Sequence, residues 1–123
     1  MIEGQEGVSW AQWVALAETC EEGGLDLFRS DHYRSFFTEA ADVLDAWGTI
    51  CALAAITDRI RLGTLVSPVT FRTAASLAKL VATADHVSGG RVELGIGAGW
   101  NEEEHRAHEL PFPPVGERMQ LLE

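Results

Sequence analysis

Apolar residues recur at helical spacing in several segments of the chain and form branched-rich runs in others. The helical spacing predicts helices over residues 9–24, 41–57, 73–90, 101–107 and 115–123. The branched-rich runs predict strands over residues 25–30, 59–67 and 91–97, with residues 1–4 as a candidate stub of an earlier strand. Ser9 with Gln12 resembles a capping box, and Asp42 and Thr73 are candidate N-caps of the second and third helices.

Helices and strands alternate along this chain, and such alternation predicts βα units around a parallel sheet. Two α/β architectures compete at this point. One is a small doubly wound sheet, and the other is part of a (β/α)8 barrel, which needs about 200 residues or more. The length of 123 residues by itself favours the first.

The segment "SGGRVELGIGAGWNEEEH" (residues 88–105) places three glycines at every second position, at Gly95, Gly97 and Gly99. Neither the dinucleotide fingerprint nor a Walker A loop fits this spacing. Because strand side chains alternate between faces, the glycines would leave one face of the strand bare. Two interpretations remain: tight packing inside a barrel, or clearance for a planar ring at the carboxyl end of the strand.

The formal net charge of −10 argues against nucleic acid and against an anionic membrane surface as partners. No apolar run is long enough to span a bilayer, and the N-terminus lacks a basic segment leading into an apolar one, so a cytoplasmic location is expected. Cys20 and Cys51 are isolated and lack metal-ligand spacing, which predicts reduced thiols.

Four segments together resemble the luciferase-like monooxygenase family, and within it the branch that uses the deazaflavin coenzyme F420. They are "LFRSDHY", "RIRLGTLVSPVTFR", "LAKLVATADHVSGGRVELGIGAGWNEEEH" and "LPFPPVGER". The resemblance implies a (β/α)8 TIM barrel with the cofactor at the carboxyl ends of the strands. Because such a barrel is longer than this chain, residues 1–123 are expected to form its N-terminal portion, roughly the first four βα units.

The resemblance also implies a site. His32 lies near the deazaflavin ring with Asp31 beside it, and an imidazole can relay protons or bond a ring carbonyl. Leu65 and Val66 stand where the family has a non-proline cis peptide whose bulge supports the ring. Gly99 and Trp100 are expected beside the cofactor, with Trp100 as a wall of the pocket. His32 is thus the catalytic candidate, and all six residues are cofactor-binding candidates.

Other polar residues admit plainer interpretations. Glu102, Glu103 and Glu104 are expected to be a solvated first helical turn, where negative charge suits the helix dipole. His86, His105 and His108 show no zinc spacing and are expected to be structural or surface residues, and no metal site is predicted. Arg72 could meet a phosphate or pair with a carboxylate. Glu109 stands where the family often has glycine. If this position has a positive φ, a glutamate there would be unfavourable.

The function implied by the resemblance is hydride transfer between F420 and a small organic substrate. An alternative within the family uses reduced FMN and oxygen as a monooxygenase. A third alternative is a non-catalytic remnant or a subunit fragment. Because an incomplete barrel exposes sheet edges and its apolar interior, self-association as a homo-oligomer or a complementing partner chain is expected.

Overall fold

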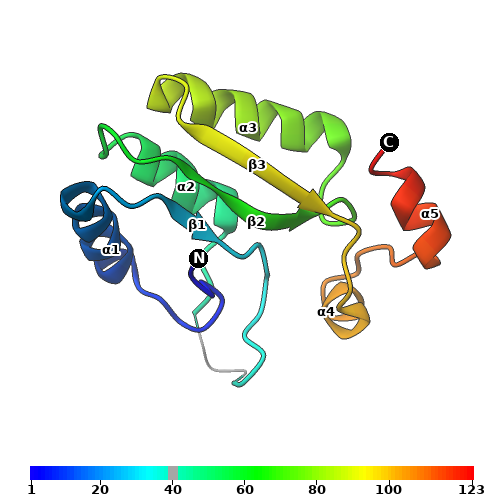
Figure 1. The fold of residues 1–123 in the computed structure, drawn as a ribbon. Coiled ribbons are helices and arrows are strands. Elements are labelled where there is room, and N and C mark those ends of the chain that lie inside the picture. The colour runs from blue at the N-terminus through cyan, green and yellow to red at the C-terminus, as the bar shows by residue number, and fades with distance from the viewer. Residues whose placement is uncertain (39–41) are drawn as a thin grey trace.

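The computed structural model describes residues 1–38 and 42–123, and within them parallel strands alternate with helices (Figure 1). In chain order the elements are α1 (Trp10–Gly23), β1 (Leu27–Arg29), α2 (Ala46–Ala54), β2 (Leu62–Pro68), α3 (Ala74–Ser88), β3 (Val92–Gly97), α4 (Glu102–Ala107) and α5 (Val115–Gln120). The strands lie in the order β1-β2-β3, and both neighbouring pairs are parallel. The predicted α/β class with a parallel sheet is therefore confirmed.

The N-terminal residues add a short piece of strand to the free edge of β1. Ile2 forms an isolated parallel bridge with Arg29, and its N–H donates to the carbonyl of Phe28 at 2.8 Å. The predicted stub of an earlier strand is thus present. Counted with this stub, residues 1–38 and 42–123 contain four successive βα units, as expected for a partial barrel.

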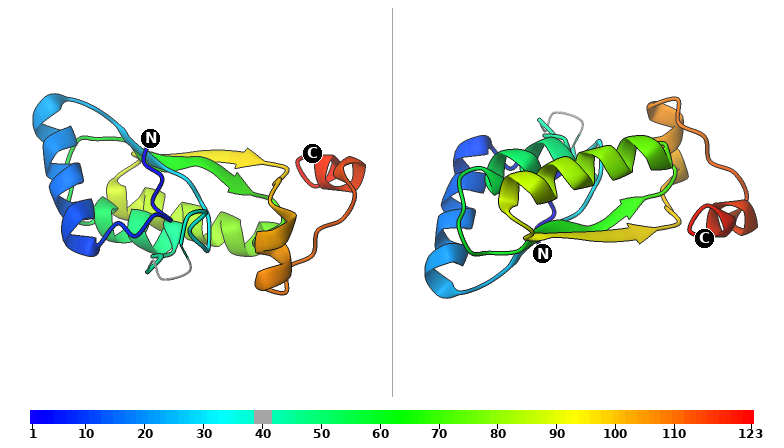
Figure 2. Two further views of the ribbon diagram at one scale, coloured as in Figure 1. Left: turned by 90° about the horizontal axis from the view of Figure 1, so that it is seen from below. Right: turned by 90° about the horizontal axis from the view of Figure 1, so that it is seen from above.

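The layers of the molecule are those of a barrel segment. Helices α2 and α3 cover one face of the sheet, and the described residues place no helix on the opposite face (Figure 2). The core lies between the sheet and the helices and contains Trp13, Trp47, Ile50, Leu53 and Leu62, each 0 % exposed. In a complete barrel the helices form the outer ring and the bare face lines the interior.

The ends of the first and third helices follow from local sequence. Ser9 accepts a hydrogen bond from the Gln12 N–H, and the Gln12 side chain accepts one from the Ser9 N–H, which completes the predicted capping box. Thr73 caps α3 in the same way through the Ser76 N–H. Gly24 ends α1 in a left-handed conformation that suits glycine, with φ of 64°.

The start of the second helix was predicted wrongly. The prediction begins at residue 41, which lies outside the described residues, and names Asp42 as the N-cap. The structure begins α2 at Ala46, and Asp45 is the cap, accepting from the Gly48 N–H at 2.7 Å. Arg72, from the segment after β2, also binds Asp45 at 2.6 Å. This contact lies 27 residues away in sequence, so no local pattern shows which aspartate caps the helix.

Candidate functional site

The carboxyl ends of the strands surround a cavity of about 460 Å³, which we call the strand-end cavity. Its lining residues are Glu3, Ser30, His32, Phe36, Leu65, Val66, Pro68, Gly97, Ala98, Gly99 and Trp100. Parallel α/β proteins bind their ligands at this end of the sheet. The predicted site residues that line the cavity are His32, Leu65, Val66, Gly99 and Trp100, whereas Asp31 does not line it.

His32 follows β1, and Glu104 of α4 holds its ring. His32 Nδ1 lies 2.8 Å from Glu104 Oε2, and the two side chains are 12 % and 0 % exposed. The ring also makes edge contacts with Phe36 and Trp100, at centroid distances of 4.6 and 6.1 Å. Because Glu104 engages Nδ1, Nε2 is the ring nitrogen left for a ligand in the strand-end cavity.

Glu104 is buried and hydrogen-bonded at both of its carboxylate oxygens. Oε1 accepts from the backbone N–H groups of Tyr33 and Arg34, at 2.7 and 3.4 Å. Burial raises the pKa of the Glu104 carboxyl, but the bonds from His32 and from these N–H groups outweigh it and leave the pKa below its ordinary value. The expected solvated turn is therefore confirmed for Glu102 and Glu103, which are exposed, and wrong for Glu104.

Asp31 is completely buried in a network of hydrogen bonds. Its Oδ2 accepts from Arg72 Nη1 at 2.7 Å and from Ser67 Oγ at 2.6 Å, and Ser67 Oγ accepts from Trp47 Nε1 at 3.0 Å. Arg72 also pairs with Asp45, so of its two expected roles the structure shows the pairing with carboxylates. A direct contact between Asp31 and a cofactor stays a prediction. The network fixes the backbone that immediately precedes the catalytic candidate.

β2 is irregular where it borders the strand-end cavity. The peptide between Leu65 and Val66 is cis, as the family resemblance implied. The register with β3 shifts between Thr64 and Ser67, so β2 has one more residue than β3 over this stretch. Leu65 and Val66 remain 54 % and 38 % exposed, and both line the cavity.

The glycines of β3 accommodate this irregular stretch of β2. A Cβ atom at Gly95 would lie 2.4 Å from the Thr64 carbonyl oxygen and 3.1 Å from Val66 Cγ1. At Gly97 a Cβ would lie 2.9 Å from Val66 Cγ2. Of the two interpretations of these glycines, the contacts therefore support tight packing against the neighbouring strand, and Gly97 also lines the strand-end cavity. The side chain that the glycines admit, Val66, itself lines the cavity.

Trp100 and Phe36 form an aromatic side of the strand-end cavity. Their ring centroids lie 5.6 Å apart, and Trp100 is 68 % exposed. Gly99, just before Trp100, has a φ of 78°, a left-handed conformation that favours glycine. Arg118 of α5 donates to the carbonyl of Gly99 and, at 2.9 Å, to that of Pro113. α5 therefore supports the backbone that presents Trp100.

Sequence reasoning missed Phe36 and Glu104 as parts of this site. Phe36 lies in an irregular segment without periodicity, so no pattern indicated the direction of its ring. Glu104 lies among three successive glutamates at the start of α4, which is a common sequence for an exposed turn. No local sequence pattern could indicate the role of Glu104, because its hydrogen-bond partners lie 70 to 72 residues earlier in the chain.

The other three histidines do not form a site together, and the contacts of His105 are structural. His105 is buried, with Nε2 2.6 Å from Thr70 Oγ1 and Nδ1 2.6 Å from the Asn101 carbonyl oxygen. Within residues 1–38 and 42–123, no group of three or more His, Cys, Asp or Glu side chains is placed to hold a metal ion. In the same part of the chain, no helix is both long and apolar enough to cross a membrane.

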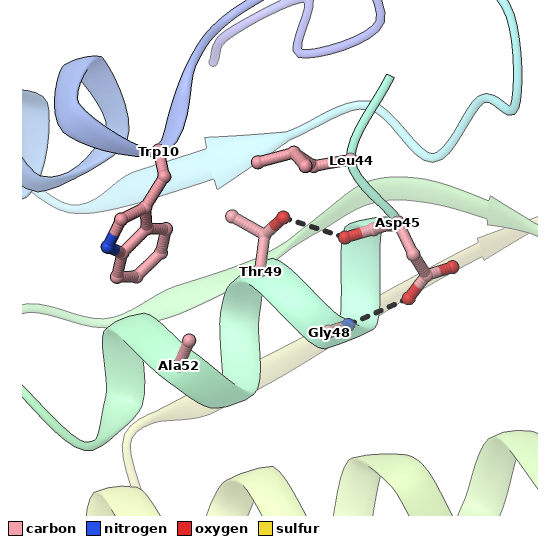
Figure 3. A pocket seen from close by; sticks show the side chains of 6 residues that line it. All are labelled: Trp10, Leu44, Asp45, Gly48, Thr49 and Ala52. Carbon is pink, nitrogen blue, oxygen red and sulfur yellow. Dashed lines mark hydrogen bonds between the residues drawn. The ribbon is translucent and has the colours of Figure 1, made fainter. Parts of the chain in front are cut away.

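A second cavity, of about 340 Å³, lies on the helical side of the molecule (Figure 3). Trp10 at the start of α1 faces Thr49 and Ala52 of α2 across it, with Leu44 and Asp45 at one end. It shares no lining residue with the strand-end cavity. Its walls are mostly apolar, and its one carboxylate, that of Asp45, already caps α2 and binds Arg72. We therefore assign it no chemical role.

Comparison with known proteins identifies the family. The family model for luciferase-like monooxygenases matches residues 2–122, so the chain belongs to the luciferase-like monooxygenase family. An uncharacterized protein of Mycobacterium tuberculosis is 46 % identical over 79 residues, which are 64 % of this chain and 27 % of that protein. An F420-dependent glucose-6-phosphate dehydrogenase of Amycolatopsis mediterranei is 35 % identical over 111 residues, which are 89 % of this chain and 33 % of the enzyme.

The fold comparison agrees with this family. The crystal structure of the monooxygenase RslO1 from Streptomyces bottropensis matches with a TM-score of 0.76 and 28 % identity, over 96 % of this chain and 37 % of that one. The chain spans about a third of the length of these relatives, 27 to 37 %. The partial TIM-barrel fold is thus shown, and the activity of a whole enzyme is a matter for proposal.

Proposed function

We propose that the strand-end cavity is the ring-binding part of an F420 site, in an oxidoreductase that transfers a hydride to or from a small organic substrate. The observation that supports this most directly is the arrangement around His32. An imidazole fixed at Nδ1 lines a cavity whose other walls include Val66, Leu65 and the Trp100–Phe36 pair. The similarity to the F420-dependent dehydrogenase of Amycolatopsis mediterranei supports this choice of cofactor.

The cavity fits the ring of such a cofactor in size and in chemistry. Its volume of about 460 Å³ lies within the range of small-molecule sites, which are mostly apolar with a few oriented polar groups. Leu65 and Val66 would support one side of the ring, and Trp100 would limit another. F420, when bound, supplies a ring carbon, C5, that accepts or donates a hydride. His32 would orient the bound groups and take up or return a proton at Nε2.

Separate titrations of the purified protein with F420 and with FMN test this proposal. Binding of F420, seen as a change in its absorbance or fluorescence, is the expected result. The Trp100→Ala substitution removes an exposed wall of the cavity and is expected to weaken F420 binding about 5- to 10-fold. Trp10→Ala is the matched control, because Trp10 is also exposed, at 42 %, but lines the other cavity. An equal weakening of F420 binding by the two substitutions would argue against the strand-end cavity as the F420 site.

An FMN-dependent monooxygenase is the second candidate, and the likeness to the monooxygenase RslO1, at 28 % identity, favours a monooxygenase reaction. The same cavity would then hold reduced FMN, and oxygen would be the second substrate. FMN binding that is tighter than F420 binding, with oxygen consumption that depends on substrate, would replace the first proposal by this one. Binding of neither cofactor would favour a non-catalytic fragment.

We also propose that a second polypeptide covers the bare face and the free edge of the sheet, either another copy of this chain or a complementing chain. Leu94 and Ile96 of the edge strand β3 are 41 % and 43 % exposed, and Leu65 of β2 is 54 % exposed. Exposed apolar strand edges readily pair with other chains. Sedimentation analysis tests this proposal, and a monodisperse monomer that melts cooperatively would contradict it.

A further inference from the structure

Glu104 and the segment that follows β1 make a set of hydrogen bonds that uses both oxygens of one buried carboxylate. Oε2 accepts from the His32 ring, while Oε1 accepts from the backbone N–H groups of Tyr33 and Arg34. Glu104 is 0 % exposed. The two backbone groups can only donate, so the orientation of the carboxylate is fixed independently of the histidine.

This geometry determines which ring nitrogen of His32 carries the proton. An ionised carboxylate can only accept hydrogen bonds, so Nδ1 must be the donor at the 2.8 Å contact with Glu104. In the neutral imidazole the other nitrogen, Nε2, then has a free lone pair. No hydrogen bond joins Nε2 to any of the residues that the structure describes, and His32 lines the strand-end cavity.

We propose that Glu104 is a positioning residue that holds neutral His32 in the Nδ1–H tautomer and so presents Nε2 to the strand-end cavity as a hydrogen-bond and proton acceptor. The lowered pKa of Glu104 is consistent with this role, because it keeps the carboxylate ionised at neutral pH. The catalytic meaning of the tautomer rests on the proposed function, whereas the tautomer itself does not. The site would then favour a bound group that donates a hydrogen bond at this position, such as a hydroxyl.

The substitution Glu104→Gln makes a specific test, because the amide has the shape of the carboxylate but only one acceptor oxygen. That oxygen must face the N–H groups of Tyr33 and Arg34, so the amide NH₂ is turned toward His32 Nδ1. Nδ1 must then accept, and the proton moves to Nε2. Glu103→Gln is the matched control, because it removes the same charge from the neighbouring residue, whose side chain is 66 % exposed and pairs with Arg34 instead.

The measurement is a long-range ¹H–¹⁵N spectrum of histidine-labelled protein without cofactor, at a pH where the rings are neutral. The His32 signals are assigned by their loss in His32→Asn. The wild type and Glu103→Gln are expected to show a protonated Nδ1 and a bare Nε2, and Glu104→Gln the reverse. Glu104→Asp, which keeps an ionised acceptor, is expected to retain the wild-type tautomer in folded protein.

Either of two results would overturn the proposal: a wild-type ring protonated at Nε2, or a folded Glu104→Gln variant with an unchanged tautomer. The wild-type spectrum decides the first even if the variant does not fold. The cofactor titration is a separate measurement on the same samples. If the tautomer is as expected and F420 does not bind, the positioning role of Glu104 stands and the proposed function fails. If F420 binds and the tautomer is the other one, the reverse holds.

Discussion

Arg72 Nη1 lies 2.7 Å from Asp31 Oδ2, and this buried ion pair joins the end of β1 to the segment that follows β2. The two side chains are 10 % and 0 % exposed. The same guanidinium binds Asp45, the N-cap of α2. One arginine therefore connects three segments, and two of them lead into the strand-end cavity.

Loss of this arginine is expected to destabilise the protein strongly. Arg72→Met leaves the Asp31 carboxylate buried without its counter-charge, and the free energy of unfolding should fall by about 3–5 kcal/mol. Urea denaturation measures the change. Arg61→Met is the control, because Arg61 pairs with Glu93 at the surface, where such a pair contributes about 0–1 kcal/mol. Similar losses in both variants would contradict the structural role of the buried pair.

The lowered pKa of Glu104 predicts a loss of stability in acid. A carboxyl whose pKa is lower in the folded state contributes stability above its unfolded pKa, and this contribution disappears as the pH falls through the folded pKa. The stabilities of the wild type and of Glu104→Gln, measured by urea unfolding, should therefore converge as the pH falls below the pKa of an unfolded glutamate, about 4.3. The contributions of titratable groups common to both proteins cancel in this comparison. A difference in the free energy of unfolding that stays constant with pH would contradict the lowered pKa of Glu104.

Gly95 is expected to tolerate no side chain. A Cβ there would lie 2.4 Å from the backbone oxygen of Thr64, so Gly95→Ala must displace β2 and should lower the free energy of unfolding by about 1–3 kcal/mol. Gly116 in α5 is the matched control, since nothing lies within 4 Å of its added Cβ. Alanine in that helix should stabilise by about 0.5–1 kcal/mol. Thermal unfolding of the two variants should give shifts of opposite sign.

Glu109 has a φ of 56°, an unfavourable conformation for a residue with a Cβ atom. Because its side chain is exposed, replacement by glycine should relieve this without loss of packing. Glu109→Gly is expected to raise the free energy of unfolding by about 0.5–1 kcal/mol. The same change at the exposed Glu102, inside α4, should be neutral or destabilising. A destabilised Glu109→Gly protein would show that the side chain has another role.

The order and type of the elements were predictable because each depends on nearby residues. The helices that begin at Trp10 and Ala74 have caps three residues from their partners, and they end at glycines. Strand positions followed from runs of branched residues. The second helix shows the limit of this approach. Local sequence does not distinguish Asp42 from Asp45 as its N-cap, and the distant Arg72 binds Asp45, which serves as the cap.

The site was predictable in part. The segments after the strands are known once a parallel sheet is expected, because the carboxyl ends of parallel strands meet at one edge. The family resemblance then indicated His32, Val66 and Trp100, and all three line the strand-end cavity, while their roles stay predictions. The position of Gly95 in a strand was also correct, but the sequence could not choose between its two interpretations, because whether a bare face is open or filled depends on the neighbouring strand.

The sequence alone determined the class of the chain, the parallel arrangement of its strands and the segments that supply the cavity, because periodicity and capping act over a few residues. Only the tertiary structure decided the charges and contacts in the site. Glu104 is buried against a histidine 72 residues earlier, and Val66 occupies the space beside two glycines of the next strand. Burial and hydrogen bonding between distant segments arise when the elements pack. They decide that the Glu104 carboxylate binds the His32 ring while neighbouring carboxylates stay solvated.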